Sequence, residues 1–312
     1  MVGYLHAESA GVTFLQWKTD GAGALDGTID GAAVSGSPPN SAVTTNAGSL
    51  TGQLDGRSVS LQVSFHTDYG SLSGDTLTLN VRQSDGSIRP IIYRRASPSD
   101  YNQALTTLRT AVAGANRRAG HDQQTAQEIK SLTDDYNTVG SDKGTLNGDL
   151  STLASDVSTA GNDLKTAHDD EKKVLAESSS GTTDVCVDAN GVDVDANGVS
   201  VDANGVSTDL VTVTNDLSAL RKAVSSLQSS LQAVRTDVPT YNGGDGNPDL
   251  TEAKKAITDA QSFTTGLVTQ VNSDIDQVNA HVADAYSYSA ATSKAGQCGS
   301  ASSAPTPIEH IK

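Results

Sequence analysis

Hydrophobic residues recur with two different periods along the chain, and the period changes near residue 96. Before that point, short runs alternate apolar and polar residues; the clearest are VTFLQW (12–17), VSLQVSF (59–65), TLTLNV (76–81) and IIY (91–93). A period of two predicts β-strands that bury one face. After residue 96, apolar residues recur every three or four positions, which predicts helices. We therefore expect an antiparallel β domain over 1–96, a helical region over 97–298 and an extended tail over 299–312.

The β domain is expected to contain around eight short antiparallel strands. Asp-Gly pairs, which favour tight hairpin turns, occur at 26–27, 30–31, 55–56 and 85–86. Strands joined in sequence by such turns form a meander, and the pattern leaves open whether it closes into a barrel or folds as a sandwich. A small barrel can enclose an apolar ligand, and the aromatic residues available to line that cavity are Tyr4, Phe14, Trp17, Phe65 and Tyr93. The same residues could equally be the core of a domain with few other aromatic residues.

Three helices are expected, over about 98–177, 185–238 and 248–295. The first has a start signal: Ser97 can cap the helix, Pro98 suits the first helical position, and Asp100 can complete a capping box. Five glycines between 114 and 148 weaken this helix. The pattern leaves open whether it is continuous or breaks near 114–122 or 140–148.

The segment VCVDANGVDVDANGVSVDANGVS (185–207) repeats nearly the same seven residues three times. Its first Val begins a column of apolar residues that recurs every seven positions up to Val234, and a second column follows four residues later. This 3-4 spacing, held over about 54 residues, predicts a coiled-coil helix. Asn-Gly hairpins fit less well, because a seven-residue unit turns every second strand over.

A calcium loop is the other alternative for this repeat. Asp193, Asp195 and Asn197 match the first half of a calcium-binding loop. The twelfth position, however, is Asn204, where such a loop needs a bidentate Glu. These three residues are therefore only a weak calcium candidate, and we expect no metal or cofactor elsewhere.

The repeat also has a second apolar face, away from the coiled-coil seam. Its residues are Val187, Gly191, Val194, Gly198, Val201 and Gly205. Each glycine costs about 1 kcal/mol relative to Ala inside a helix. We therefore expect close packing against this face, either by another helix of the same chain or by a second copy or protein partner.

The two cysteines lie far apart in the sequence, at 186 and 298. Short connections make consecutive helices antiparallel, and the second and third helices would extend about 80 and 70 Å. The third helix would thus return Cys298 to the neighbourhood of Cys186. We predict a disulfide between them, with two free thiols as the alternative, in an α+β chain whose β domain is followed by a long antiparallel three-helix coiled-coil stalk. A persistent disulfide implies an oxidising compartment outside the cytoplasm.

Charge and motifs exclude several classes of function. The net charge of −16 argues against binding to nucleic acid or to an anionic membrane. We find no apolar run long enough to span a bilayer, and MVGYLHAES lacks the features of an export signal. Metalloprotease, nucleophile-elbow and phosphate-loop motifs are absent from the sequence. His66 and Asp68 could belong to a hydrolytic site, but a solvated pair is the simpler interpretation. We expect a protein that is not an enzyme.

Several segments resemble predicted exported proteins and lipoproteins of high-GC Gram-positive bacteria. They are GVTFLQW, LDGTIDG, LTGQLDG, LSGDTLTL, SDYNQAL, VCVDANGV and the late AGQCG with PTPI. The resemblance covers most of the chain, implies a secreted or cell-surface location and brings no catalytic residue with it. An export signal, and any lipid-bearing cysteine, is expected upstream of this sequence.

These observations predict an extracellular structural or binding protein. Its β domain would be carried by a rigid helical stalk and would bind a protein partner or build a surface assembly. A carrier of a small apolar ligand inside the β domain is the alternative, and a hydrolase with an unrecognised site comes third.

Overall fold

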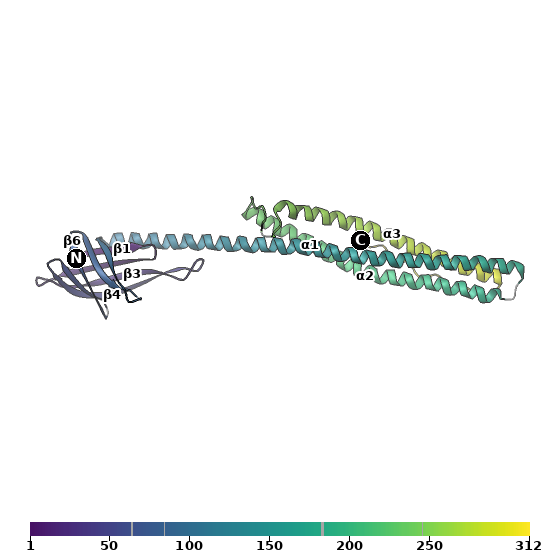
Figure 1. Cartoon of the computed structure of the whole chain (residues 1–312), viewed down its shortest axis with the longest axis horizontal. Helices are drawn as coiled ribbons and strands as arrows, with labels where there is room; N and C mark the ends of the chain where they lie inside the picture. Colours follow the sequence, from purple (N-terminus) through teal and green to yellow (C-terminus); the bar gives the residue numbers. More distant parts are fainter. Residues whose placement is uncertain (64, 84, 182–183, 245) are drawn as a thin grey trace. The chain divides into compact units, whose positions relative to one another are not determined.

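The computed structural model describes residues 1–312 except 64, 84, 182, 183 and 245. It forms two compact units, Met1–Gln124 and Thr125–Lys312. Within the described residues, eight strands precede three helices (Figure 1). The strands are β1 (Val2–Glu8), β2 (Gly11–Thr19), β3 (Ala24–Ser35), β4 (Ala42–Asp55), β5 (Ser58–Val63), β6 (His66–Ser73), β7 (Thr76–Arg82) and β8 (Ile88–Arg95), and the helices are α1 (Pro98–Ser180), α2 (Val185–Asp237) and α3 (Leu250–Gly296).

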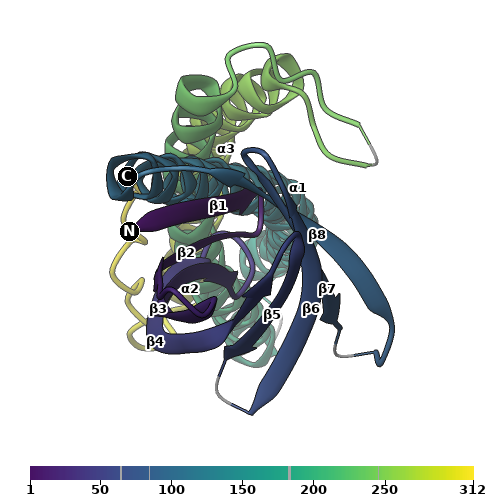
Figure 2. The ribbon, with the colours of Figure 1, turned by 90° about the vertical axis from the view of Figure 1, so that its left-hand side faces the viewer.

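The strands form a closed antiparallel barrel (Figure 2). Each strand pairs with the next, and β8 pairs back with β1 through Tyr4–Arg95 and Leu5–Arg94. Of the barrel and the sandwich, which the sequence pattern left open, the structure has the barrel. The apolar run at 59–65 extends past β5: residue 64 lies outside the described residues, and Phe65 lies in a turn.

Asp-Gly pairs have two different roles in the barrel. Those at 55–56 and 85–86 lie at hairpin connections, whereas those at 26–27 and 30–31 lie inside β3, so the turn prediction there was wrong. Gly27 pairs with Trp17 of β2. A methyl group on Gly27 would lie 1.9 Å from the carbonyl oxygen of Gln16. This glycine is therefore needed for close strand approach beside the indole.

Alternate strand residues fill the interior of the barrel. The buried set is Tyr4, Leu15, Trp17, Leu25, Leu50, Val59, Leu61, Leu77, Leu79 and Tyr93. Eight strands enclose a space that side chains can just fill. The rings of Tyr4 and Trp17 stack with centroids 5.0 Å apart.

The beginning of α1 covers one outer face of the barrel. Val12 and Ala32 of the strands are buried together with Leu105 and Leu108 of α1. Farther along α1, the Asn116 amide donates to the Ser41 carbonyl at 2.7 Å and accepts from its N–H at 3.2 Å. The first compact unit therefore extends into α1 as far as Gln124, beyond the change of period at residue 96.

Helix α1 begins as the sequence indicates and continues through its glycines. The Ser97 N–H donates to the Asp100 carboxylate at 2.7 Å, and the Asp100 N–H donates to the Ser97 hydroxyl at 3.3 Å. Both regions where a break was considered are helical. The helix ends at Ser180, three residues past the expected end at 177.

The second unit is a three-helix arrangement around a core that repeats every seven residues. From α2 the core receives the two predicted columns, among them Val192, Ala196, Val199, Ala203, Val206, Leu210, Val213 and Leu217. The VDANG repeat is therefore helical, and the hairpin and calcium-loop alternatives are wrong. The predicted disulfide is present: Cys186 Sγ and Cys298 Sγ lie 2.11 Å apart. None of the helices within the described residues combines the length and apolarity needed to cross a bilayer.

Candidate functional site

The aromatic residues expected to line a ligand cavity do not share one. Tyr4, Trp17 and Tyr93 face the barrel interior and are 2%, 1% and 6% exposed. Phe14 lies on the outer face against Tyr101 of α1, and Phe65 is 97% exposed, so the cavity prediction was wrong for both. An empty space large enough for a ligand would leave the three interior rings exposed, and instead protein atoms enclose them. Burial raises the pKa of Tyr93 to about 12, so this phenol is neutral at physiological pH.

His66 and Asp68 lie two residues apart on β6 and therefore on the same face of the strand. His66 is exposed and Asp68 is half-buried. Burial raises the pKa of Asp68, and the neighbouring His66 partly offsets that rise. No group of three or more His, Cys, Asp or Glu side chains within the described part of the chain is arranged to hold a metal ion.

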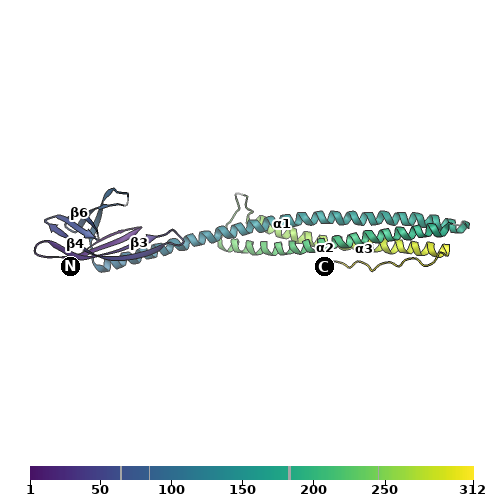
Figure 3. The ribbon, with the colours of Figure 1, turned by 90° about the horizontal axis from the view of Figure 1, so that it is seen from below.

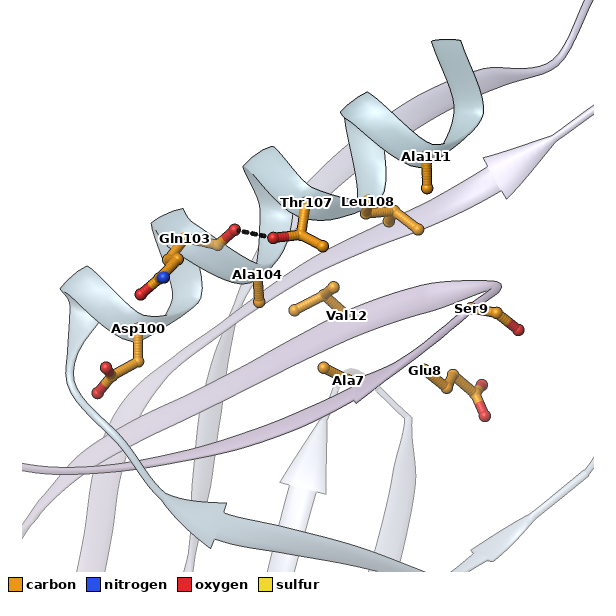
Figure 4. Close-up of a pocket in the computed structure, with 10 residues that line it drawn as sticks. All are labelled: Ala7, Glu8, Ser9, Val12, Asp100, Gln103, Ala104, Thr107, Leu108 and Ala111. Carbon is orange, nitrogen blue, oxygen red and sulfur yellow. Dashed lines mark hydrogen bonds between the residues drawn. The ribbon is translucent and has the colours of Figure 1, made fainter. Parts of the chain in front are cut away.

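An apolar groove of about 530 Å³ lies between the β1–β2 hairpin and the first turns of α1 (Figure 4). Its lining residues are Ala7, Glu8, Ser9, Val12, Asp100, Gln103, Ala104, Thr107, Leu108 and Ala111. The acidic side chains Glu8 and Asp100 project at opposite ends of it (Figure 4). The Asp100 carboxylate is already held by Ser97 at the start of the helix. The groove therefore offers apolar surface without converging polar groups.

The Val/Gly face predicted on α2 divides into two parts. A methyl group on Gly198 would lie 3.3 Å from Asp163 Oδ2 of α1, and one on Gly205 would lie 2.9 Å from Asp156 Oδ2. These glycines thus lie close to another helix of the same chain. The valines of the face, by contrast, point outward: Val187, Val194 and Val201 are 71%, 61% and 67% exposed. We call these three residues the Val stripe.

Acidic residues of α1 and α2 face one another in five successive pairs. The pairs are Glu177–Asp188, Asp170–Asp195, Asp163–Asp202, Asp156–Asp209 and Asp149–Asp216, and in each the nearby acid of the other helix helps to raise the pKa of one member. On both helices the members are seven residues apart, and they run in opposite directions. This arrangement, which we call the carboxylate ladder, was not predicted from the sequence. The signal was present as two columns of acidic residues with the period of the core.

The ladder is a seam of like charge. Burial, followed by the charge of the facing acid, raises the pKa of Asp195, Asp202 and Asp209. One carboxylate oxygen of each of these residues is enclosed without a hydrogen-bond donor among the described residues. Two ionised carboxylates offer only acceptors, so a single shared proton satisfies both members of a pair.

The three weak calcium candidates diverge from one another. The Asp193 carboxylate accepts from the Ser289 hydroxyl of α3 at 2.6 Å, and this bond lowers its pKa. The Asn197 side chain accepts from the Tyr286 hydroxyl at 2.9 Å. Asp195 faces α1 as part of the ladder. The calcium hypothesis is therefore wrong at these positions, because the oxygens do not converge on one point.

The tail, residues 299–312, lies beside α2 and α3 (Figure 3). Ile308 and Ile311 are half-buried against the helical core. Their backbone groups bond to two asparagines of α3, Asn279 and Asn272. The sequence predicted that the tail is extended but not that it is docked, since two isoleucines in a polar segment give no periodic signal.

Comparison of the whole sequence with models of protein families and with curated proteins finds no match.

Proposed function

We propose that this protein is an exported, non-enzymatic binding protein whose helices form a coiled-coil stalk that carries the barrel and associates with a second copy along the Val stripe. The Cys186–Cys298 disulfide supports the extracellular location, because disulfides persist in oxidising compartments. The resemblance of the sequence to exported proteins of high-GC Gram-positive bacteria supports it too. The seven-residue period of the buried residues supports the coiled coil.

The observation that carries the proposal is the exposure of the Val stripe. Its residues occupy the outward position of each heptad, where a polar residue is usual. Because the spacing is even, a second copy placed antiparallel brings Val194 opposite its own equivalent and Val187 opposite the equivalent of Val201. Such a contact is self-complementary. It is also small, so we expect weak association that becomes important only where many copies are held on one surface.

The carrier alternative has less support, because side chains fill the barrel interior. The hydrolase alternative rests on His66 and Asp68, which form a largely solvated pair.

Sedimentation velocity over a range of concentrations tests the proposal. The intact chain is expected to show reversible self-association, and the Val187→Ser/Val194→Ser/Val201→Ser variant is expected to remain monomeric. The matched control is Thr208→Ala/Asn215→Ala, which changes the same outward position farther along α2 and should associate like the intact chain. A monomeric intact chain at every concentration would contradict self-association.

A further inference from the structure

Two of the points that hold the tail, which we call its anchors, share one chemical scheme. The Asn279 amide donates to the Ile308 carbonyl at 2.9 Å and accepts from the Ile308 N–H at 2.8 Å. The Asn272 amide makes the same pair of bonds to Ile311, at 3.2 and 2.9 Å. A side-chain amide has the donor and acceptor of a peptide unit, so each asparagine pairs with an extended backbone as a neighbouring strand would.

The spacing of the anchors matches helix geometry to extended-chain geometry. Asn279 lies seven positions after Asn272 on the helix, a rise of about 10.5 Å. Ile311 lies three positions after Ile308, which is about 9 Å in a polyproline II conformation. Pro305 and Pro307 just upstream favour that conformation. The surface of α2 and α3 beneath the tail, which we call the tail groove, therefore fits an extended segment whose apolar residues are three positions apart.

Nearer the root of the tail, the Ser302 N–H and hydroxyl donate to the Asp193 carboxylate at 3.2 and 2.9 Å. Residues 304–309 arch over a space of about 330 Å³ between the tail and the two helices. The remaining contacts are exposed, such as His310 with Asp276 at 2.9 Å and the Arg221 guanidinium with the Lys312 carbonyl at 3.2 Å. The disulfide at Cys298 fixes the root of the tail, so residues 299–312 can leave the groove without unwinding α3.

We propose that this groove also binds the tail of a second copy, so that neighbouring copies exchange tails. The occupant follows from the structure, because the chain's own tail is the segment whose fit is seen. Exchange of identical segments keeps every hydrogen bond and apolar contact of the closed form. The proposal rests on the proposed self-assembly for its biological context, but it uses a surface separate from the Val stripe.

Two full-length variants test tail exchange by complementation. Ile308→Asp/Ile311→Asp leaves the groove intact and empty, and Asn272→Ala/Asn279→Ala leaves the tail intact and free. Neither variant can pair with itself by this route. An equimolar mixture is expected to sediment as a complex of twice the 32.0 kDa chain mass. A synthetic peptide of residues 301–312 should then dissociate it. A mixture that sediments as separate monomers would overturn the proposal.

Controls separate this result from the Val stripe and from misfolding. Replacing the asparagine variant by Ser273→Ala/Gln277→Ala, which changes exposed residues of α3, should remove most of the complex, because that tail stays in its own groove. Adding the triple Val→Ser change to both partners should leave the tail complex intact, whereas association through the stripe would disappear. In the unaltered chain, hydrogen exchange at the Ile308 and Ile311 amides should be slow. Unprotected exchange there would overturn the proposal without any variant.

Discussion

At the scale of single residues, the clearest constraint is the absence of a side chain at Gly27. A Cβ atom there would lie 1.9 Å from the Gln16 carbonyl oxygen and 2.7 Å from the Trp17 Cα atom. Both are backbone atoms, so strands β2 and β3 would have to separate. We expect Gly27→Ala to lower the free energy of unfolding of the barrel by about 3 kcal/mol or more, at the upper end of the usual cost of overpacking.

Denaturant unfolding followed by Trp17 fluorescence measures this effect, because Trp17 is the single tryptophan of the chain and is buried in the barrel. Gly21→Ala is the matched control, since the added methyl group would have no described residue within 4 Å other than its chain neighbours. The two variants should differ clearly in their transition midpoints. Equal midpoints would mean that the strands tolerate the methyl group.

The residue scale also shows what a strand pattern can and cannot predict. Phe14 and Trp17 lie in one apolar run, but an odd separation places them on opposite faces of β2. That rule was available in the sequence and argues against a shared cavity. Phe14 is nevertheless buried, on the outside of the barrel. This could not be predicted, because its partner Tyr101 comes from a helix that starts after the barrel ends.

At the scale of elements, the glycines of α2 differ in what surrounds them. Among the described residues, and apart from the backbone of its own helix, nothing lies within 4 Å of a methyl group added at Gly191, whereas at Gly205 the Asp156 carboxylate would lie 2.9 Å away. Gly191→Ala should therefore gain most of the helix propensity difference, about 0.8–1 kcal/mol. Gly205→Ala should gain less, because the carboxylate must move. Thermal unfolding followed by far-UV circular dichroism compares them, and an equal gain would show that Asp156 moves freely.

The carboxylate ladder predicts an unusual pH dependence for the pairing of α1 and α2. Burial and the facing acids raise the pKa of Asp195, Asp202 and Asp209 above the ordinary 3.8. A raised folded-state pKa means that the folded form binds protons more tightly than the unfolded chain. Stability should therefore rise as the pH falls from neutral through the raised pKa values, and the gain should be complete near 3.8. Below that, the opposing loss at Asp193, whose pKa is lowered, should begin.

Isosteric amides separate this effect from the general charge of the chain. Asp195→Asn/Asp202→Asn places an N–H donor opposite each facing carboxylate. It should therefore raise the free energy of unfolding of the helical unit at pH 7 by about 1 kcal/mol per pair. It should also flatten the rise on acidification. Asp142→Asn/Asp284→Asn removes the same number of charges outside the ladder and is the control. Equal behaviour of the two double variants would contradict a specific role for the ladder.

Element boundaries and the buried seam were predictable because a core position recurs with a fixed period. Most of the two α2 columns were identified, since apolar residues that recur every three or four positions mark the buried side of a helix. The ladder was missed because acidic residues are ordinarily solvated, and only the register between two helices reveals that they face one another. Continuity of α1 could not be predicted either: glycine lowers helix propensity locally, and packing of the neighbouring turns outweighs that cost.

At the scale of the whole molecule, the Cys186–Cys298 disulfide connects the chemistry of the chain to its surroundings. The two residues lie 112 positions apart, and their Cα atoms are 5.2 Å apart. The bond therefore joins the start of α2 to the end of α3 and closes nearly the whole α2–α3 hairpin. In an oxidising compartment this disulfide should persist in the native protein. The state of the two thiols is therefore also a test of the proposed location.

Reduction should act on the helical unit and not on the barrel, since both cysteines belong to Thr125–Lys312. Closing a loop of this length restricts the unfolded chain by about 4–5 kcal/mol in the loop-entropy model. A reductant should therefore lower the helical transition seen by circular dichroism, while the Trp17 fluorescence transition of the barrel stays in place. Cys186→Ser/Cys298→Ser should reproduce the reduced protein and no longer respond to the reductant. Alkylation of the native, unreduced protein should find no free thiol. If both thiols react freely, the disulfide is absent from native material and the extracellular proposal loses its structural support.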